Sequence, residues 1–158
     1  MTPTISIYRI GNWFYRKKLK SIATVFSYIN RFFFSAWIPS SVSAGKNFIL
    51  GYWGLGIVIH SHTRIGDNVT IAQNVTIGRN FKDRKVPIIG NDVYIGAGSV
   101  IFGEITIGNN VIIGSNSLIN KNIPDNCTVV GNPCRIIERD RLLKYYELDT
   151  KNEFKIDE

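Results

Sequence analysis

Two histidines are the residues best suited to chemistry in this sequence of 158 residues. His60 and His62 are its only histidines, and they directly follow a glycine-rich stretch. Histidine changes its charge near neutral pH, so it suits general base catalysis, which typically contributes ~10²–10⁴-fold to a rate. A lone histidine is also often a packing or surface residue. His60 is the stronger candidate because it comes straight after the glycine-rich stretch, and His62 is held in reserve.

Other reactive centres find little support in the sequence. A zinc site shared between subunits needs three suitable ligands and an open position, which two histidines two residues apart do not supply, so we expect no metal. No Ser-His-Asp arrangement or nucleophilic cysteine is evident. Cys127 and Cys134 form neither a disulfide framework nor a metal-ligand pattern, which favours reduced thiols in a cytoplasmic protein. We expect Cys134 to pack as a small apolar side chain.

The element that must position His60 is a repeat of six residues. Isoleucine recurs at every sixth position over 59–119, and Asp83 alone breaks the series; the isoleucines are Ile59, Ile65, Ile71, Ile77, Ile89, Ile95, Ile101, Ile107, Ile113 and Ile119. A period of six fits neither a helix nor a two-sided strand. It predicts a β-helix, in which each hexad forms one short side and then turns a corner. An ordinary β-sandwich would show irregular strand spacing.

The corners of such a coil are expected at polar turn residues. Asn68, Asn74 and Asn126 match the glycosylation sequon, but in this repeat they read as corner asparagines with left-handed backbone conformations. Across a corner, the side chains of His60 and His62 are expected to diverge.

Two stretches interrupt the repeat, and function concentrates in loops that leave a rigid scaffold. Gly51–Gly56 carries three glycines around two aromatic residues, and Arg79–Pro87 is a charged loop. We expect these loops to shape a substrate pocket, with Trp53, Gln73, Arg84 and Lys85 as its substrate-binding residues.

The regions on either side of the coil differ from it. Residues 1–43 form a predicted N-terminal helical segment with one or two helices over 4–38. Ile7, Ile10 and Phe14 share one face of the first, and the second has an apolar face of Ile22, Val25, Phe26, Ile29 and Phe33. The β-helix is expected over 44–137, and a C-terminal helix over 138–148 followed by an acidic tail to 158.

Charge is distributed unevenly along the chain. No Asp or Glu precedes Asp67, so the first 66 residues carry a net charge of +8. The remaining residues carry −1, which gives the net charge of +7 for the whole chain. Charged residues interrupt every apolar run in residues 1–38 well short of the ~20 residues that span a bilayer. Two interpretations of the segment remain, and they are compatible. In one it is a cap on the first rung that contacts neighbouring subunits, and in the other it is a basic amphipathic surface that rests on anionic lipid at the inner face of the cell membrane. No nucleic-acid-binding motif is recognised.

The chain resembles the hexapeptide-repeat acyltransferases, specifically serine acetyltransferase-like O-acetyltransferases of bacterial polysaccharide gene clusters. The resemblance covers about residues 8–137 and lies in four segments: Gly54-Leu-Gly-Ile-Val-Ile-His60, Ile65–Gly78, Val86–Gly98 and Val130-Gly-Asn-Pro-Cys-Arg135.

The resemblance implies a left-handed parallel β-helix, against the usual right-handed crossover. It also implies a homotrimer with active sites between subunits, and acetyl-CoA as cosubstrate. His60 would deprotonate the acceptor hydroxyl. The residues implied for the CoA arm and its phosphates are Gly78, Ala97, Gly98, Ser115, Lys121 and Arg135.

The departures from serine acetyltransferases decide the expected acceptor. One catalytic histidine of those enzymes corresponds to Trp53 here, and the other to Val86 or Lys85. Their helical N-terminal domain is also much longer. These differences favour a sugar hydroxyl of a bacterial surface polysaccharide or its precursor. Serine O-acetylation is the first alternative, and a non-catalytic trimeric scaffold, which the Trp53 substitution supports, is the second.

Overall fold

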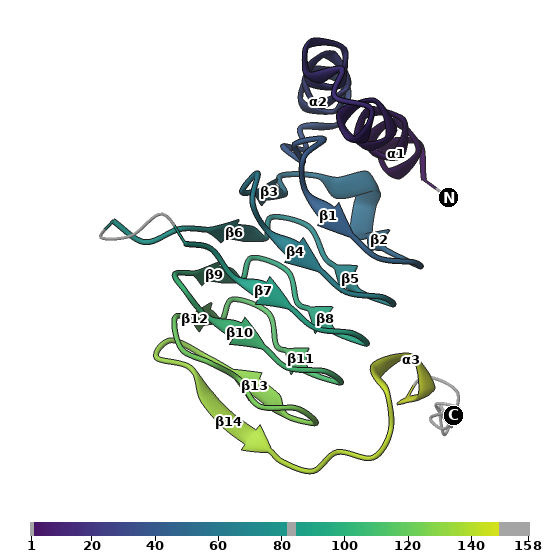
Figure 1. Cartoon of the computed structure of the whole chain (residues 1–158). Coiled ribbons are helices and arrows are strands. Elements are labelled where there is room, and N and C mark those ends of the chain that lie inside the picture. The colour runs from purple at the N-terminus through teal and green to yellow at the C-terminus, as the bar shows by residue number, and fades with distance from the viewer. Residues whose placement is uncertain (1, 82–84, 149–158) are drawn as a thin grey trace, which may run out of the picture.

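The protein is a parallel β-solenoid with a helical hairpin at one end (Figure 1). The computed structural model describes residues 2–81 and 85–148. The helices are α1 (Pro3–Arg16), α2 (Lys20–Phe34) and α3 (Tyr145–Leu148), and the short 3₁₀ turn η1 covers Gly51–Gly54. The two helices predicted within 4–38 are α1 and α2.

Three sheets form the sides of the solenoid. The first contains β1 (Ser43–Ala44), β4 (Arg64–Ile65), β7 (Ile88–Ile89) and β10 (Thr106–Ile107). The second contains β2 (Ile49–Leu50), β5 (Thr70–Ile71), β8 (Tyr94–Ile95), β11 (Ile112–Ile113), β13 (Thr128–Val130) and β14 (Arg135–Glu138). The third contains β3 (Val58–Ile59), β6 (Thr76–Gly78), β9 (Val100–Phe102) and β12 (Leu118–Ile119).

The isoleucine series forms the core, as the repeat predicts. Each of the ten isoleucines is at most 5% exposed. In register they stack in files along the solenoid, for example Ile59 on Ile77 on Ile101. A side chain buried in this way typically contributes ~1.5–3 kcal/mol, so the files account for much of the driving force for coiling.

The charged loop lengthens by six residues the turn of the solenoid in which it lies. Ile59 and Ile77 pair in register eighteen residues apart, whereas Ile65 and Ile89 pair twenty-four apart. Asp83 therefore does not mark a defective core position, because the core continues in register at Ile89. Asp83 itself lies outside the described residues.

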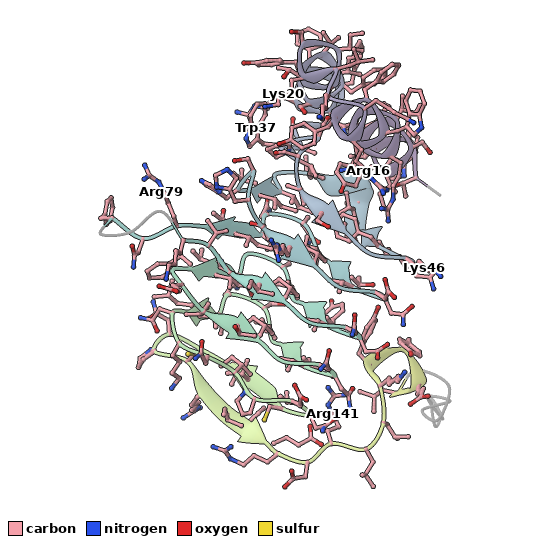
Figure 2. The ribbon with its side chains drawn as sticks, in the orientation of Figure 1. Arg16, Lys20, Trp37, Lys46, Arg79 and Arg141 are labelled. Carbon is pink, nitrogen blue, oxygen red and sulfur yellow. The ribbon has the colours of Figure 1, made fainter. Side chains whose placement is uncertain are left out.

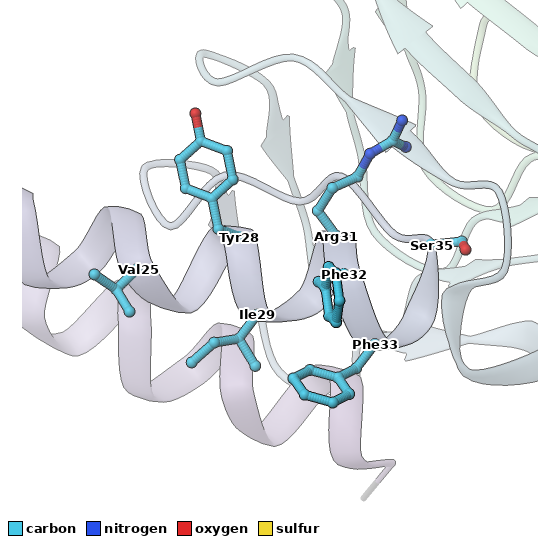
Figure 3. Close-up of a pocket in the computed structure, with 7 residues that line it drawn as sticks. All are labelled: Val25, Tyr28, Ile29, Arg31, Phe32, Phe33 and Ser35. Atoms are coloured by element: carbon cyan, nitrogen blue, oxygen red, sulfur yellow. The ribbon is translucent and has the colours of Figure 1, made fainter.

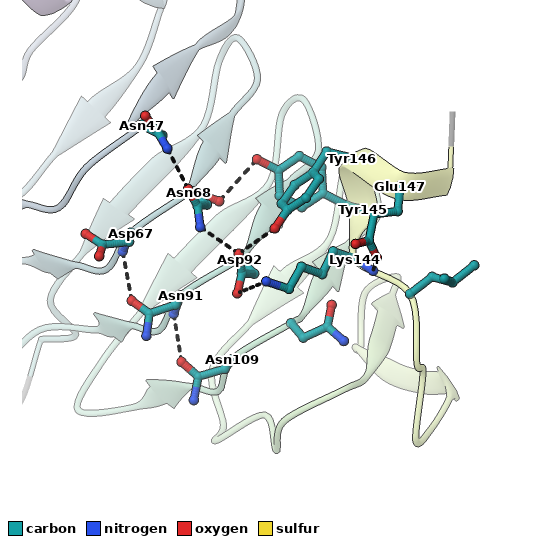
Figure 4. Close-up of polar contacts among 12 residues, drawn as sticks. Asn47, Asp67, Asn68, Asn91, Asp92, Asn109, Lys144, Tyr145, Tyr146 and Glu147 are labelled. Atoms are coloured by element: carbon teal, nitrogen blue, oxygen red, sulfur yellow. Dashed lines mark hydrogen bonds and ion pairs between the residues drawn. The ribbon is translucent and has the colours of Figure 1, made fainter. Parts of the chain in front are cut away.

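Polar ladders hold one edge of the solenoid (Figure 4). Asn47 donates to Asn68 at 2.9 Å, and Asn68 donates to Asp92 at 2.8 Å. Asn68, Asn74 and Asn126 have φ of 55°, 59° and 59°, which confirms the predicted left-handed corners.

The C-terminal region differs from the prediction. A helix over 138–148 is wrong for most of that range, because the described helix covers Tyr145–Leu148 alone. Before it, β14 crosses the predicted boundary at 137 and pairs antiparallel with β13. Arg141 then crosses the last turn, donating from its backbone N–H to Asn126 O at 2.9 Å, so the segment covers the open end of the coil.

Candidate active site

The predicted site residues lie at two different corners of the solenoid. Gly78 ends a strand of the third sheet, and His60 and Lys121 follow strands of the same sheet, all at the corner that leads toward the first sheet. We call this the histidine corner. Trp53, Gln73, Ala97, Gly98 and Ser115 lie at the corner between the second and third sheets, which we call the amide corner. Within one chain the two groups are therefore separated by the width of the third sheet.

His60 is half-buried and fixed by its neighbours on the backbone. Its N–H donates to Ile77 O at 2.9 Å, and its carbonyl accepts from Thr63 N–H at 3.0 Å. The backbone N–H of His62 donates to Nδ1 of His60 at 3.3 Å. In the neutral ring the proton therefore sits on Nε2, and Nδ1 keeps the lone pair.

The two histidine rings meet, contrary to the expectation that they diverge. Their centroids lie 5.3 Å apart with the planes at 69°. The corner between them is tight, because the backbone N–H of His62 bonds to the ring of His60. This bond keeps His62 folded back over His60.

The surroundings of His60 favour its neutral form. Burial, then the neighbouring His62, then Arg79 lower the pKa of His60 below its usual 6.5. Each of the three disfavours a positive imidazolium. At neutral pH the ring is therefore ready to accept a proton.

A groove runs beside the histidine corner. It encloses about 680 Å³ on the first sheet and lies between His62 and the far end of the charged loop. Lys85 forms an ion pair with Glu104 at its wall. The groove residues are His62, Arg64, Lys85, Val86, Ile88, Glu104, Ile105, Thr106 and Asn122. Arg84, the other loop residue predicted to bind substrate, lies outside the described residues.

The amide corner presents backbone donors to the surface. Gly98 N–H donates to Gln73 O at 3.0 Å, and Asn116 N–H donates to Ala97 O at 2.8 Å, so the successive turns stack directly. Among the described residues, no acceptor bonds to the backbone N–H of Ala97 or of Ser115. Gly98 has φ of 71°, and a Cβ there would lie 2.3 Å from Asn116 Oδ1. Unpaired backbone donors of this kind can bind carbonyl oxygens of a ligand.

The other predicted cofactor residues are accessible. No atom of residues 2–81 or 85–148 lies within 4 Å of the position of a Cβ on Gly78, so these residues leave its corner open. Lys121 is exposed on the histidine corner, and Arg135 is exposed on β14. Cationic side chains of this kind suit phosphate oxygens. No described group of three His, Cys, Asp or Glu side chains could hold a metal ion.

Trp53 forms part of an aromatic hollow. Its φ of 58° turns the ring outward, where it is 57% exposed, and its carbonyl accepts from the Thr4 hydroxyl. The ring meets Phe34 edge to face at 6.2 Å. A hollow of about 430 Å³ is lined by Phe33, Phe34, Ser35, Tyr52, Trp53 and Leu55.

Arg79 is a site residue that the sequence reasoning did not assign. It lies at the start of the charged loop, close enough to His60 to affect its pKa. The signal was available in the repeat, since Arg79 follows two residues after Ile77, which pairs with Ile59 directly before His60. The labelled side chain extends from the solenoid at the base of this loop in Figure 2.

Comparisons with known proteins agree on one family. The family described as "Bacterial transferase hexapeptide (six repeats)" matches residues 87–121. Serine acetyltransferase of Helicobacter pylori is 34% identical over 136 residues, which cover 85% of this chain and 79% of that protein. Serine acetyltransferase of Bacillus pumilus is 38% identical over 132 residues, 82% of this chain and 60% of that protein.

Solved structures give the same result. A serine acetyltransferase from Vibrio cholerae has a TM-score of 0.84 at 33% identity, covering 96% of this chain and 58% of that one. A serine acetyltransferase from Brucella abortus in complex with coenzyme A has a TM-score of 0.81 at 31% identity, covering 85% and 54%. The fold is thus the left-handed parallel β-helix of these structures, as predicted. The chain spans about 60% of the Bacillus pumilus relative.

Proposed function

This chain belongs to the hexapeptide-repeat transferase family as a relative of the serine acetyltransferases, and we propose that it transfers an acetyl group from acetyl-CoA to a hydroxyl acceptor with His60 as general base. The observation that carries the proposal is the histidine corner. The half-buried imidazole of His60 has a lowered pKa there, and the neighbouring ring of His62 lines a groove of about 680 Å³. General base catalysis requires such a group.

The ring geometry specifies how His60 would act. Nδ1 holds the lone pair and, within the described part of the chain, receives only the long 3.3 Å bond from His62 N–H. The acceptor hydroxyl replaces this donor and gives its proton to Nδ1 as its oxygen attacks the thioester carbonyl. When the intermediate collapses, the C–S bond breaks and the imidazolium returns the proton to the departing CoA sulfur. Burial, His62 and Arg79 favour that return because they disfavour the charged ring.

The separation of the two corners supports a trimer. One chain holds the proposed base and the pantetheine-binding amides on opposite edges of the third sheet. A closed three-fold arrangement of side-by-side solenoids would bring the histidine corner of one subunit against the amide corner of the next. Gly98, Ala97 and Ser115 would then bind the CoA arm, and Lys121 or Arg135 its phosphates.

L-serine is the acceptor that the relatives favour, since the proteins named above are serine acetyltransferases. The preference for a sugar, which the sequence alone suggested, is the less supported of the two. One structural feature keeps it as a second candidate. Trp53 and Tyr52 present exposed rings in a hollow, and aromatic faces of this kind suit the apolar face of a sugar ring.

Two variants test the role of His60. His60→Ala should lower the rate of CoA release by ~10²–10⁴-fold, because the base is lost. His62→Ala is the matched control, with the same truncation next to the ring, and should retain activity within about tenfold of the wild type. Calorimetry with CoA checks that the donor site is intact in both variants. Full activity of His60→Ala would reject the assignment.

An acceptor panel separates the candidate functions. Release of free CoA is followed with a thiol-reactive dye, with L-serine, free hexoses and nucleotide-linked hexoses as sole acceptors. We expect turnover with L-serine, and turnover only with hexoses would select the sugar enzyme. Absence of CoA binding by calorimetry would reject both and favour the non-catalytic scaffold. The buried free thiols of Cys127 and Cys134 favour a reducing, cytoplasmic setting for the reaction.

A further inference from the structure

The helical hairpin α1–α2 exposes its apolar side chains. Phe32 is 83% exposed, Phe33 70% and Val25 56%. Together with Tyr28, Ile29, Arg31 and Ser35 they line a shallow hollow of about 710 Å³ (Figure 3). Soluble monomers rarely leave a contiguous apolar patch of this kind uncovered.

The side of α2 that packs on the rest of the protein is small and polar instead. Ala23, Ser27 and Asn30 are its buried residues. Ser27 Oγ accepts from Ser40 N–H at 2.9 Å, and Asn30 Nδ2 donates to Thr4 O at 3.1 Å. The apolar face that the sequence pattern identifies is therefore not the face that caps the solenoid.

The apolar face is bordered by positive charge alone. Arg16, Lys17, Lys18, Lys20 and Arg31 are all exposed, and no Asp or Glu occurs before Asp67. Lys17 Nζ lies 5.9 Å from the centroid of the Trp13 ring, which is itself exposed. In Figure 2, Arg16 and Lys20 lie at the edge of the hairpin nearest the solenoid.

This charge pattern distinguishes between the surfaces that could cover the hairpin. The hairpin of a second copy would bring two basic surfaces together, with no acidic residue in either hairpin to neutralise them. An anionic lipid surface supplies both an apolar interior for the rings and phosphates for the cations. None of the helices in the described part of the chain combines the length and apolar character needed to cross a bilayer.

We propose that the α1–α2 hairpin binds the surface of an anionic phospholipid bilayer, with Phe32, Phe33, Val25 and Ile22 inserted among the acyl chains and with Lys17 and Lys18, in the turn between the helices, bound to lipid phosphates. Trp13 suits the same level, because aromatic rings concentrate at the membrane–water interface. The hairpin lies at one end of the solenoid, so the remaining turns extend away from the bilayer (Figure 1). The proposal does not depend on the acetyl-transfer activity.

Vesicle co-sedimentation of the full chain tests the proposal. Vesicles of phosphatidylcholine with about a third phosphatidylglycerol should bind the protein, and vesicles of phosphatidylcholine alone should bind it at least tenfold more weakly, because about 1 kcal/mol per cation is lost. Raising the salt concentration should release the protein. Equal binding to both kinds of vesicle would overturn the role of charge.

Variants separate the two contributions. The pair Lys17→Glu and Lys18→Glu should weaken binding about five-fold or more for each charge. The pair Phe32→Ser and Phe33→Ser should weaken it about tenfold or more for each ring. The matched control is Phe81→Ser with Leu142→Ser, which removes two exposed apolar side chains outside the hairpin and should leave binding unchanged.

Light scattering provides the decisive alternative outcome. If the wild type forms an assembly larger than a trimer, and the pair Phe32→Ser and Phe33→Ser lowers the mass of that assembly, a second copy covers the face and the proposal is wrong. Unchanged vesicle binding by that pair would also overturn it. Expected instead is the same assembly for both proteins, with vesicle binding lost in the variant.

Discussion

The solenoid and the helical hairpin use apolar residues in opposite ways. In the solenoid, Ile59, Ile95 and Ile113 are fully buried. In the hairpin, Ile10 and Ile22 are 47% and 44% exposed, although each belongs to an equally clear apolar face. An apolar pattern therefore specifies which side chains will be covered, but not whether the covering surface belongs to the same chain.

The difference follows from where each element finds its partner. An inner rung of the solenoid is covered by a similar rung above and below it, so the repeat itself supplies the surface that buries its apolar side chains. The hairpin has no repeat, and it packs on the first turn through Ile5, Tyr8 and Ser27. Tyr8 also donates its hydroxyl to Val42 O at 2.7 Å, so polar anchoring adds to the apolar packing of Ile5 and Tyr8 on the core.

The largest expected effect is on the free energy of unfolding, when an isoleucine is replaced by alanine in the solenoid and, for comparison, in the hairpin. Ile113→Ala should lower the free energy of unfolding by ~2–5 kcal/mol, because a cavity opens between Ile95 and Val129. Ile22→Ala should change it by about 0.5 kcal/mol or less, since the side chain is largely in water. Urea unfolding measures both. Equal losses would show that the hairpin face is buried in solution.

A second effect should arise at the corners. A Cβ on Gly96 would lie 2.5 Å from Ser115 N and 2.8 Å from Gly114 C, both backbone atoms of the next turn. Gly96→Ala should therefore cost ~1–3 kcal/mol through displacement of that turn. Gly78→Ala is the control, because open space surrounds its Cβ position. A stable Gly96→Ala protein would contradict the close stacking of turns at this corner.

The pH dependence of acetyl transfer sharpens the description of the histidine corner. The pKa of His60 is lowered, so the rate should be retained as pH falls below 6.5 and decline only below the lowered pKa. Arg79→Gln removes a cation that disfavours the imidazolium, so the pKa of His60 should rise and the acid limb should move to higher pH. Profiles of kcat/KM against pH measure this shift. An unmoved limb would exclude Arg79 as an electrostatic neighbour of the base.

The smallest effect should appear at the C-terminal segment. Lys144 Nζ lies 3.2 Å from Asp92 Oδ2, and the Tyr146 hydroxyl donates to Asp92 Oδ1 at 3.1 Å (Figure 4). Burial raises the pKa of Asp92, but hydrogen bonds from Asn68, Lys144 and Tyr146 outweigh it, so the net pKa is lowered. This contribution is present above the ordinary Asp pKa and is lost as pH falls through the lowered value.

Asp92→Asn tests that contact. Hydrogen exchange over residues 141–148 should accelerate in the variant at neutral pH, whereas overall stability should barely change because exposed ion pairs contribute little. At a pH below the pKa of Asp92, wild type and variant should exchange alike. A large loss of global stability in the variant would contradict a local role.

The repeat made the solenoid predictable almost residue by residue, including the corner asparagines at Asn68 and Asn74. The rest depended on contacts that no local pattern encodes. The His60–His62 contact follows from the exact turn of one corner, and Arg79 approaches it from the next turn. At the other end, Arg135–Glu138 forms a strand because β13 offers an edge, so a helical interpretation of the neighbouring residues fails.

The most direct test of the central claim is activity of mixed subunits, because acetyl transfer is proposed to use the histidine corner of one subunit and the amide corner of the next. His60→Ala and Ser115→Trp should each be inactive alone. Co-refolded in equal amounts, they should regain about one quarter of wild-type activity, since about one interface in four then pairs two intact corners. No recovery, with trimers confirmed by light scattering, would contradict the shared site.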